Sequence, residues 1–181
     1  LHLETGHQTL LLAGQPRQHL ATARRHPGGL LGLVSHVGDG RHVLVETLKR
    51  PYSYVTTWQR FARDVDVVDV ETGKSVRVAS LPAAERVPVR GVPMGPRDFA
   101  WQANAPATLL WPEALDQGDW KVQVPQRDKL MRWAAPFEGA PSEVARTTQR
   151  YSGAQWLAAG SEPFVYEYDA NRQWIDASLL V

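Results

Sequence analysis

Thirteen prolines, spread along the whole chain, limit more than any other feature what these 181 residues can form. A proline inside a helix removes a backbone hydrogen bond and clashes with the preceding turn, so few windows here can hold a helix of ordinary length. Between the prolines, short β-branched or aromatic runs alternate with clusters of turn-forming residues. This pattern is typical of an all-β protein built from short antiparallel strands.

Two hairpins can be placed from their turns. The strand at 43–46 follows Gly38-Asp39-Gly40, where glycine adopts a positive φ without steric cost. The run at 65–70 reads VDVVDV and returns at 75–78 after the turn at 71–74. Further strands are predicted at the remaining apolar and aromatic runs, which are 108–111, 120–124, 130–133, 164–168 and 174–180.

Three segments repeat a similar order of turn, apolar strand and glutamate, at 35–46, 101–113 and 156–167. Repeats of about 40–50 residues with loop insertions are typical of β-propeller blades. We therefore predict a partial propeller of about three consecutive antiparallel blades over residues 1–181. The predicted blades are 1–30 (partial), 31–95, 96–150 and 151–181 (partial), which is fewer than the four to eight of a closed propeller.

Composition excludes several classes of function. A formal net charge of +1 provides no field that would attract nucleic acid or an anionic membrane, and the apolar runs are too short to span a bilayer. The absence of cysteine excludes disulfides, thiolate metal sites and a cysteine nucleophile. It leaves the compartment open, so a periplasmic, secreted or cytoplasmic location in a bacterium is equally compatible with it.

Catalytic and metal motifs are also missing from the sequence. No serine stands in the Gly-x-Ser-x-Gly context of a hydrolase nucleophile, and every histidine lies at or before His42. The histidine spacings do not match a zinc site, and no phosphate-binding glycine loop follows a strand. We assign no catalytic residue, metal or cofactor. The tryptophans Trp101, Trp111, Trp133 and Trp156 are expected to pack in the core.

Ten stretches resemble, in the expected order, the middle of the propeller of prolyl oligopeptidase-family serine peptidases. The likeness is greatest to the glutamyl endopeptidase-like branch of bacteria and plastids. The stretches are Lys49–Tyr54, Arg60–Arg63, Val65–Gly73, Leu81–Glu85, Gly91–Arg97, Asn104–Trp111, Glu113–Asp116, Val124–Asp128, Ala135–Phe137 and Glu167–Asp169.

The resemblance implies a two-part enzyme, in which a propeller caps a separate α/β-hydrolase domain that carries the Ser-Asp-His triad. The chain, which starts at Leu1, would be an internal piece of the cap that gates and helps to select peptides. Its partners would be the hydrolase domain, the remaining blades and the peptide substrate. Open blade edges would also favour self-association. The alternatives are a free-standing β-propeller or β-sandwich module that binds a peptide or glycan, and a small intact hydrolase.

One tract is a candidate substrate-binding site, because a planar guanidinium binds both oxygens of a carboxylate and a glutamate-selective peptidase needs such a group. Its members are Arg50, Tyr52, Tyr54, Arg60 and Arg63. The alternative is that these arginines pair with Glu46, Asp64 or Asp66 while the aromatic rings pack against a strand.

Overall fold

In the computed structural model, the chain divides into two compact units, Leu1–Glu85 (unit 1) and Arg86–Val181 (unit 2). The backbone is described for residues 7–11, 20–25, 31–36, 39–52, 55–157 and 162–180, and the side chains for 39–52, 55–157 and 162–180. Within these ranges all regular elements are strands except one short 3-10 helix, which confirms the all-β prediction. In the part of the chain that is described, no helix has the length and apolar character needed to cross a membrane.

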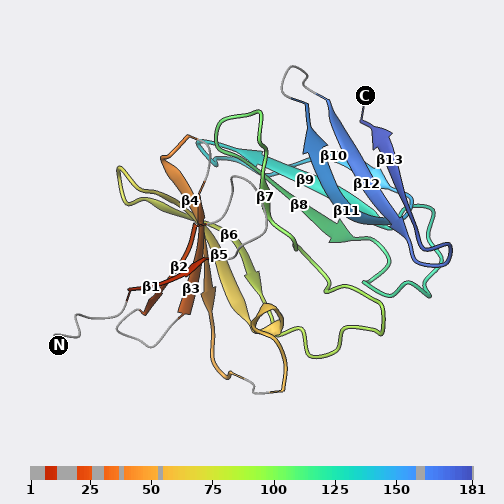
Figure 1. Cartoon of the computed structure of the whole chain (residues 1–181), viewed down its shortest axis with the longest axis horizontal. Coiled ribbons are helices and arrows are strands. Elements are labelled where there is room, and N and C mark those ends of the chain that lie inside the picture. Colours follow the sequence, from red (N-terminus) through yellow and green to blue (C-terminus); the bar gives the residue numbers. More distant parts are fainter. Residues whose placement is uncertain are drawn as a thin grey trace. The chain divides into compact units, whose positions relative to one another are not determined.

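Unit 1 is a single antiparallel sheet in which each strand pairs with the next one in sequence (Figure 1). Its strands are β1 (His7–Leu11), β2 (Leu20–Arg25), β3 (Leu31–His36), β4 (His42–Leu48), β5 (Arg63–Asp69) and β6 (Ser75–Leu81). Alternate residues of β5 are buried, with Val65 and Val67 at 0% and 1% exposure. This alternation is that of a strand with one face on the core.

Both predicted hairpins of unit 1 are confirmed. His36 pairs with Val43 across the β3–β4 turn, and Val68 pairs with Ser75 across the β5–β6 turn. Gly40 and Gly73 lie in these turns at φ 69° and 73°, in the left-handed region that favours glycine.

Unit 2 contains two antiparallel sheets, of four and three strands (Figure 1). The first has the order β10-β9-β8-β7 and the second the order β11-β12-β13. The strands are β7 (Ala100–Trp101), β8 (Thr108–Ala114), β9 (Asp128–Ala134), β10 (Ser142–Thr147), β11 (Arg150–Trp156), β12 (Pro163–Asp169) and β13 (Trp174–Leu179). These meandering sheets are compatible with propeller-like blades, and the blade boundaries stay a prediction.

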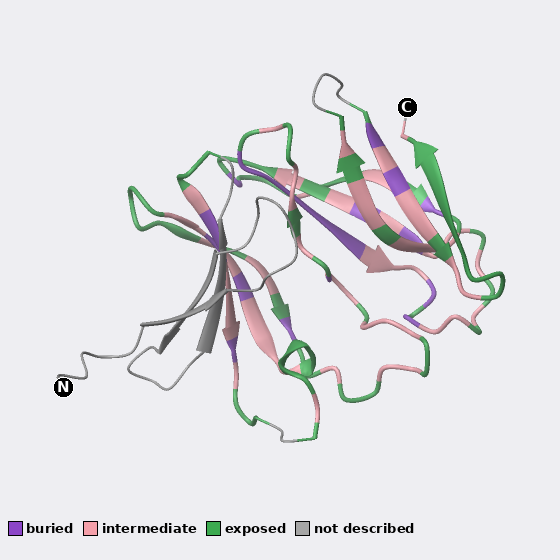
Figure 2. Ribbon diagram, viewed as in Figure 1, coloured by how far each residue is buried: buried purple, intermediate pink, exposed green. Residues whose placement is uncertain are grey.

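The core of unit 2 is centred on β8, whose first five residues are all buried (Figure 2). Pro112 lies opposite Leu130 of β9, but its carbonyl accepts the amide of Arg97 on the other side of β8. Because the N and C=O of one strand residue face the same side, the proline nitrogen also points away from β9, and β7 pairs only with Leu109 and Leu110. Trp111 is 2% exposed, which confirms its predicted core position.

The other predicted core tryptophans are less deeply buried. The rings of Trp101 and Trp133 make edge-on contacts with Phe137, with centroids 6.3 Å and 5.7 Å apart. Trp156 is half-buried on β11. The two ring contacts are consistent with the packing role predicted for Trp101 and Trp133.

The strand predicted at 120–124 is wrong, because this segment is a turn followed by irregular chain. The carboxylate of Asp119 accepts a hydrogen bond from the amide of Lys121, and its carbonyl accepts one from the amide of Val122. A local aspartate thus binds backbone donors that a strand would present to a neighbour.

Candidate functional site

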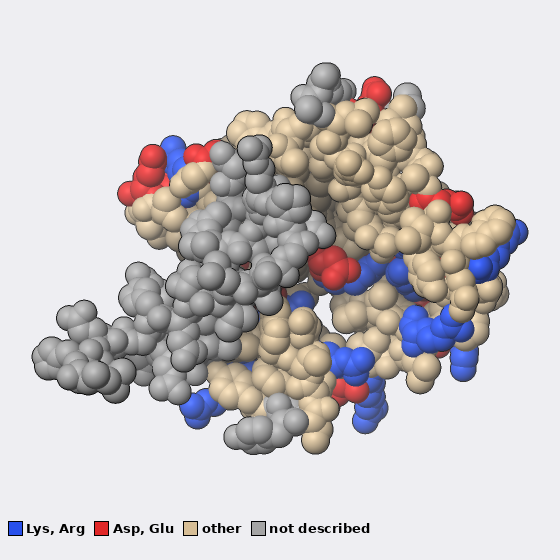
Figure 3. All heavy atoms as spheres, viewed as in Figure 1, with Lys and Arg blue, Asp and Glu red and all other residues tan. Residues whose placement is uncertain are grey.

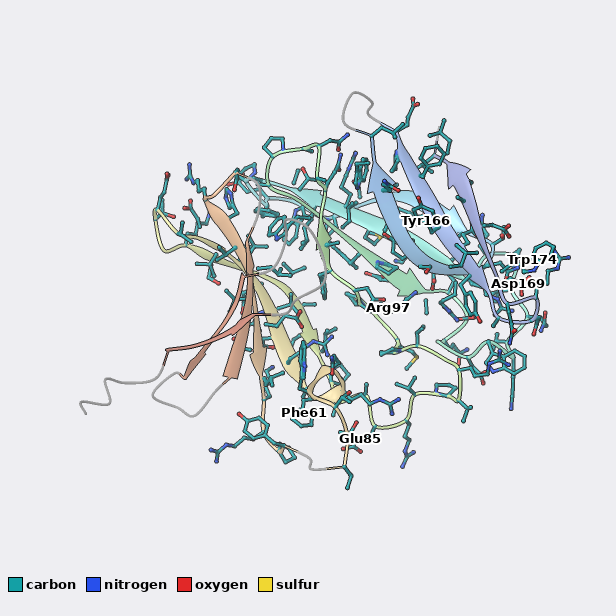
Figure 4. All side chains as sticks on the ribbon, in the orientation of Figure 1. Phe61, Glu85, Arg97, Tyr166, Asp169 and Trp174 are labelled. Atoms are coloured by element: carbon teal, nitrogen blue, oxygen red, sulfur yellow. The ribbon has the colours of Figure 1, made fainter. Side chains whose placement is uncertain are left out.

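The predicted peptide-binding tract forms the connection between β4 and β5 in unit 1. The amide of Lys49 donates to the carbonyl of Ala62 and closes the base of this connection at 2.7 Å. The 3-10 helix η1 (Trp58–Arg60) lies shortly before β5 and is followed by Phe61 (Figure 4). The amide of Ala84 donates to the carbonyl of Arg60 at 2.8 Å, so the segment after β6 supports the backbone of the connection.

A guanidinium and two aromatic rings meet at this connection. The guanidinium carbon of Arg50 lies 5.8 Å from the centroid of the Tyr52 ring. That ring stacks on Phe61, with centroids 5.8 Å apart and planes 25° from parallel. Arg50 and Tyr52 are exposed, whereas Phe61 is half-buried. Stacking on a ring restrains an arginine while leaving its N–H groups available to an anion.

Arg63 uses its guanidinium inside the protein. Its Nε donates to Oε2 of Glu46 at 2.7 Å, and its Nη1 donates to the carbonyl of Gln59 at 2.6 Å. The Arg63 side chain is only 13% exposed. For this arginine the structure therefore bears out the alternative of an internal pair with Glu46.

The other predicted residues differ from Arg63. Arg60 is exposed, and neither Arg50 nor Arg60 has a carboxylate partner in the described ranges. Tyr54 lies outside the described residues. Asp64 and Asp66, the other carboxylates considered as partners, pair instead with Lys49 and Arg77. A role for the tract in peptide binding stays a prediction.

A second group of charged residues, in unit 2, was not singled out as a site from the sequence. We call it the buried charge cluster, and its members are Arg97, Asp116, Arg127, Asp128 and Arg150. Arg97 is held beside β8 (Figure 4) by a hydrogen bond from its amide to the carbonyl of Pro112. Asp116 follows β8 and Asp128 begins β9, and both carboxylates are completely buried.

Arg150, the first residue of β11, bridges the two carboxylates of the cluster. Its Nη2 donates to Oδ2 of Asp116 and its Nη1 to Oδ1 of Asp128, both at 2.6 Å. Arg97 donates to Oδ2 of Asp128 at 2.6 Å, and Arg127 donates to Oδ2 of Asp116 at 2.9 Å. The cluster therefore joins the four-stranded sheet to the three-stranded sheet.

The electrostatics of the cluster follow from its burial. Burial alone raises the pKa of the Asp116 carboxyl, but hydrogen bonds from Arg150 and Arg127 outweigh this effect and hold the pKa below its usual range. Burial also raises the pKa of the nearby Tyr151 hydroxyl to about 12, with a smaller contribution from the negative charge of Asp98. Carboxylates bound in this way are suited to a structural role rather than to proton transfer.

The sequence marked most residues of the buried charge cluster without showing that they pair. Four of its five members lie in the stretches that resemble the peptidase propeller. These four are Arg97, Asp116, Arg127 and Asp128. Their mutual pairing depends on contacts between residues far apart in the chain, such as Arg97 and Asp128. No local pattern reports such contacts.

The described residues contain no group of three or more histidine, cysteine, aspartate or glutamate side chains that could hold a metal ion. His42 contacts Asp39 through Nδ1 at 2.9 Å, and the other carboxylate oxygen of Asp39 accepts the amides of Arg41 and His42. This contact therefore stabilises the β3–β4 turn.

Two curated proteins are similar to this chain. It is 34% identical over 146 residues to a probable chloroplastic glutamyl endopeptidase of Oryza sativa subsp. japonica. Over the same number of residues it is 36% identical to the probable chloroplastic glutamyl endopeptidase of Arabidopsis thaliana. The match covers 76% of this chain and 15% of each relative. No family model and no solved structure matches the chain. The comparison supports a relationship to peptidases.

Proposed function

We propose that this chain is a non-catalytic segment of the β-propeller of a glutamyl endopeptidase-like serine peptidase of the prolyl oligopeptidase family. The observation that carries the proposal is the similarity to two plant proteins of that name over 146 residues. Antiparallel sheets that meander in sequence order support it, because propeller blades are sheets of this kind. The chain spans about 15% of the length of these relatives, so catalysis is assigned to another part of the protein.

In this proposal the segment gates and helps to select peptides for a separate α/β-hydrolase domain, together with the remaining blades of the propeller. Arg50 and Arg60 would bind acidic side chains of the peptide. Both are exposed, and Arg50 is restrained by the ring of Tyr52. Arg63 would act as a positioning residue, because its hydrogen bonds to Glu46 and Gln59 tie the first residue of β5 to β4 and to η1.

The proposal is tested by peptide binding to this chain. Fluorescence anisotropy would compare a labelled extended peptide that contains one glutamate with the same peptide carrying glutamine. We expect the glutamate peptide to bind about two- to fivefold more tightly, which is the range for an exposed ion pair. Arg50→Gln and Arg60→Gln should each weaken binding of the glutamate peptide, and the double variant should remove the preference.

Arg132→Gln is the matched control, since Arg132 is an exposed arginine on β9 of unit 2. This variant should keep both the affinity and the preference. Equal binding of the two peptides by the unmodified chain would contradict the assigned role of the arginines. So would equal losses in the control and the test variants.

A further inference from the structure

Two buried polar atoms of unit 2 lie beside Asp128 without a hydrogen-bond partner in the part of the chain that the structure describes. They are Nη1 of Arg97 and Oγ1 of Thr147. Arg97 is 4% exposed and Thr147 is 1% exposed, so the chain itself covers both side chains. Another blade or another domain therefore cannot reach these atoms. Buried polar groups normally have a partner, which here has to be small enough to lie inside the unit.

The strand pairing places both residues next to Asp128 on one face of the four-stranded sheet. Thr147 of β10 lies directly opposite Asp128 of β9, and the side chains of directly opposite residues share a face. Arg97 runs along the other side of β8, where its amide donates to the carbonyl of Pro112 (Figure 4). Its Nη2 reaches Oδ2 of Asp128 at 2.6 Å. Asp128 therefore has Arg97 on its β8 side and Thr147 on its β10 side.

The three-stranded sheet covers this face. Arg150 of β11 donates to Oδ1 of Asp128, and the amide of Tyr151 donates to Oδ2 at 2.7 Å. Ala114 of β8 lies opposite Asp128 and carries only a methyl group, so the long side chain of Arg97 can cross β8 at this level. The two unpartnered atoms are thus enclosed between the two sheets of unit 2.

Charge and hydrogen-bonding capacity decide which small molecule fits there. Nη1 of Arg97 can only donate, whereas the Thr147 hydroxyl both donates and accepts. Oδ1 of Asp128 accepts a hydrogen bond from Arg150 and has a further lone pair. An anion would lie against the Asp128 carboxylate, which is unfavourable in a poorly solvated site. Water can accept from Arg97 and donate to Thr147 and Asp128, and buried waters typically make about three such bonds.

We propose that a buried water molecule bridges Nη1 of Arg97 and Oγ1 of Thr147 beside Asp128. The Arg97 guanidinium then has a partner on Nη1 as well as on Nη2, while its Nε lies 3.5 Å from Oδ2 of Asp98. The water connects β10 to the segment before β7 and so extends the buried charge cluster across the four-stranded sheet. This site lies wholly inside unit 2 and does not depend on the proposed function.

Thr147→Val tests the bridge through the sign of its effect. Valine has nearly the shape of threonine, so replacing a buried hydroxyl that has no partner should leave or raise the urea midpoint of unit 2. Loss of a water-bridging hydroxyl should instead lower the midpoint by about 0.3–1 M. Thr108→Val is the matched control, because the buried Thr108 hydroxyl donates to the carbonyl of Pro106 at 3.0 Å. It should cause a similar decrease. An unchanged or raised midpoint for Thr147→Val would overturn the proposal.

NMR detects the water in the unmodified chain. We expect nuclear Overhauser effects between water and the amide and methyl protons of Thr147, as for a water held inside a protein. Thr108 controls for exchange of hydroxyl protons, because its hydroxyl bonds to the protein. Equal effects at the two residues, or none at Thr147, would overturn the proposal. A urea midpoint that is higher in sodium chloride than in sodium gluconate at equal ionic strength would show a bound anion instead and would overturn it as well.

Discussion

The two units use charged residues in opposite ways. In unit 1, Lys49 and Arg77 pair with Asp64 and Asp66 across neighbouring strands, and the side chains of both cations are 41–51% exposed. We call this set the surface ion-pair ladder. In unit 2, the buried charge cluster pairs three arginines with Asp116 and Asp128, whose side chains are 0% and 1% exposed. Figure 3 shows that basic and acidic side chains also lie near one another on the visible surface.

Burial decides what each arrangement contributes to stability. Water and salt screen an exposed pair, so breaking it changes the free energy of unfolding little. A buried pair carries a large desolvation penalty, and removing one partner leaves the other charge uncompensated in a poorly solvated site. The cluster should therefore tolerate single substitutions far less well than the ladder.

The largest expected effect is that of Asp128→Asn. This carboxylate accepts hydrogen bonds from Arg97, Arg150 and the amide of Tyr151. Removing its charge should lower the free energy of unfolding by about 3–5 kcal/mol. Tryptophan fluorescence during urea unfolding measures this loss. Only Trp58 lies in unit 1, so the signal comes mainly from unit 2. Asp66→Asn is the matched control in the ladder. Because it lies in unit 1, its unfolding is followed by far-UV circular dichroism. Equal losses of unfolding free energy in the two variants would contradict the comparison.

Acid should destabilise the cluster through Asp116. The pKa of this carboxyl is below its usual range in the folded state, so its stabilising contribution is complete above the unfolded value of about 3.9 and is lost as the pH falls toward the folded pKa. The urea midpoint of unit 2 should therefore fall between pH 6 and pH 3. Asp116→Asn should reduce this pH dependence, and an unchanged dependence would show that Asp116 is not its source.

A pair of intermediate burial should give an intermediate effect. Arg63 and Glu46 are 13% and 16% exposed, and Arg63 also donates to Gln59. Arg63→Gln should lower the free energy of unfolding of unit 1 by about 1–2 kcal/mol. Far-UV circular dichroism during urea unfolding measures the loss. Arg60→Gln, at an exposed position nearby, should leave the midpoint unchanged. A loss as large in Arg60→Gln would show that burial is not the cause.

The smallest effect is expected for Arg77→Gln in the ladder. The Arg77 side chain is 51% exposed, although it contacts both Asp64 and Asp66. Its loss should lower the free energy of unfolding by less than about 1 kcal/mol, and most of that difference should disappear in 1 M salt. Urea unfolding at low and high salt measures both values. A loss that persists in high salt would show that Arg77 behaves like the arginines of the buried charge cluster.

Local turn chemistry made part of the fold predictable. Gly40 and Gly73 marked the two hairpins of unit 1, since few other residues adopt a positive φ readily. The β12–β13 turn has Gln173 at φ 59°, where no glycine signals the bend. Asp169 nevertheless accepts the amides of Asn171 and Arg172. In the same way, Asp69 accepts the amides of Glu71 and Thr72 in the β5–β6 turn of unit 1. The aromatic runs on either side located these two strands instead.

The candidate site was only partly predictable for a related reason. Sequence proximity brought Arg50 and Tyr52 together, whereas the stacking of Phe61 on Tyr52 depends on how the β4–β5 connection closes. Glu46 was one of three carboxylates proposed to pair with the arginines of the tract. The pairing of Leu48 with Arg63 across β4 and β5 brings Glu46 within reach of Arg63.

The central claim is that this chain helps to select acidic peptides and does not cleave them. The most direct measurement incubates the purified chain with the glutamate-containing peptide and follows the peptide by mass spectrometry, with and without a serine-directed inhibitor. The account predicts that the peptide is bound and remains intact in both samples. Cleavage after the glutamate that the inhibitor abolishes would contradict it, because a nucleophilic serine would then lie within these 181 residues.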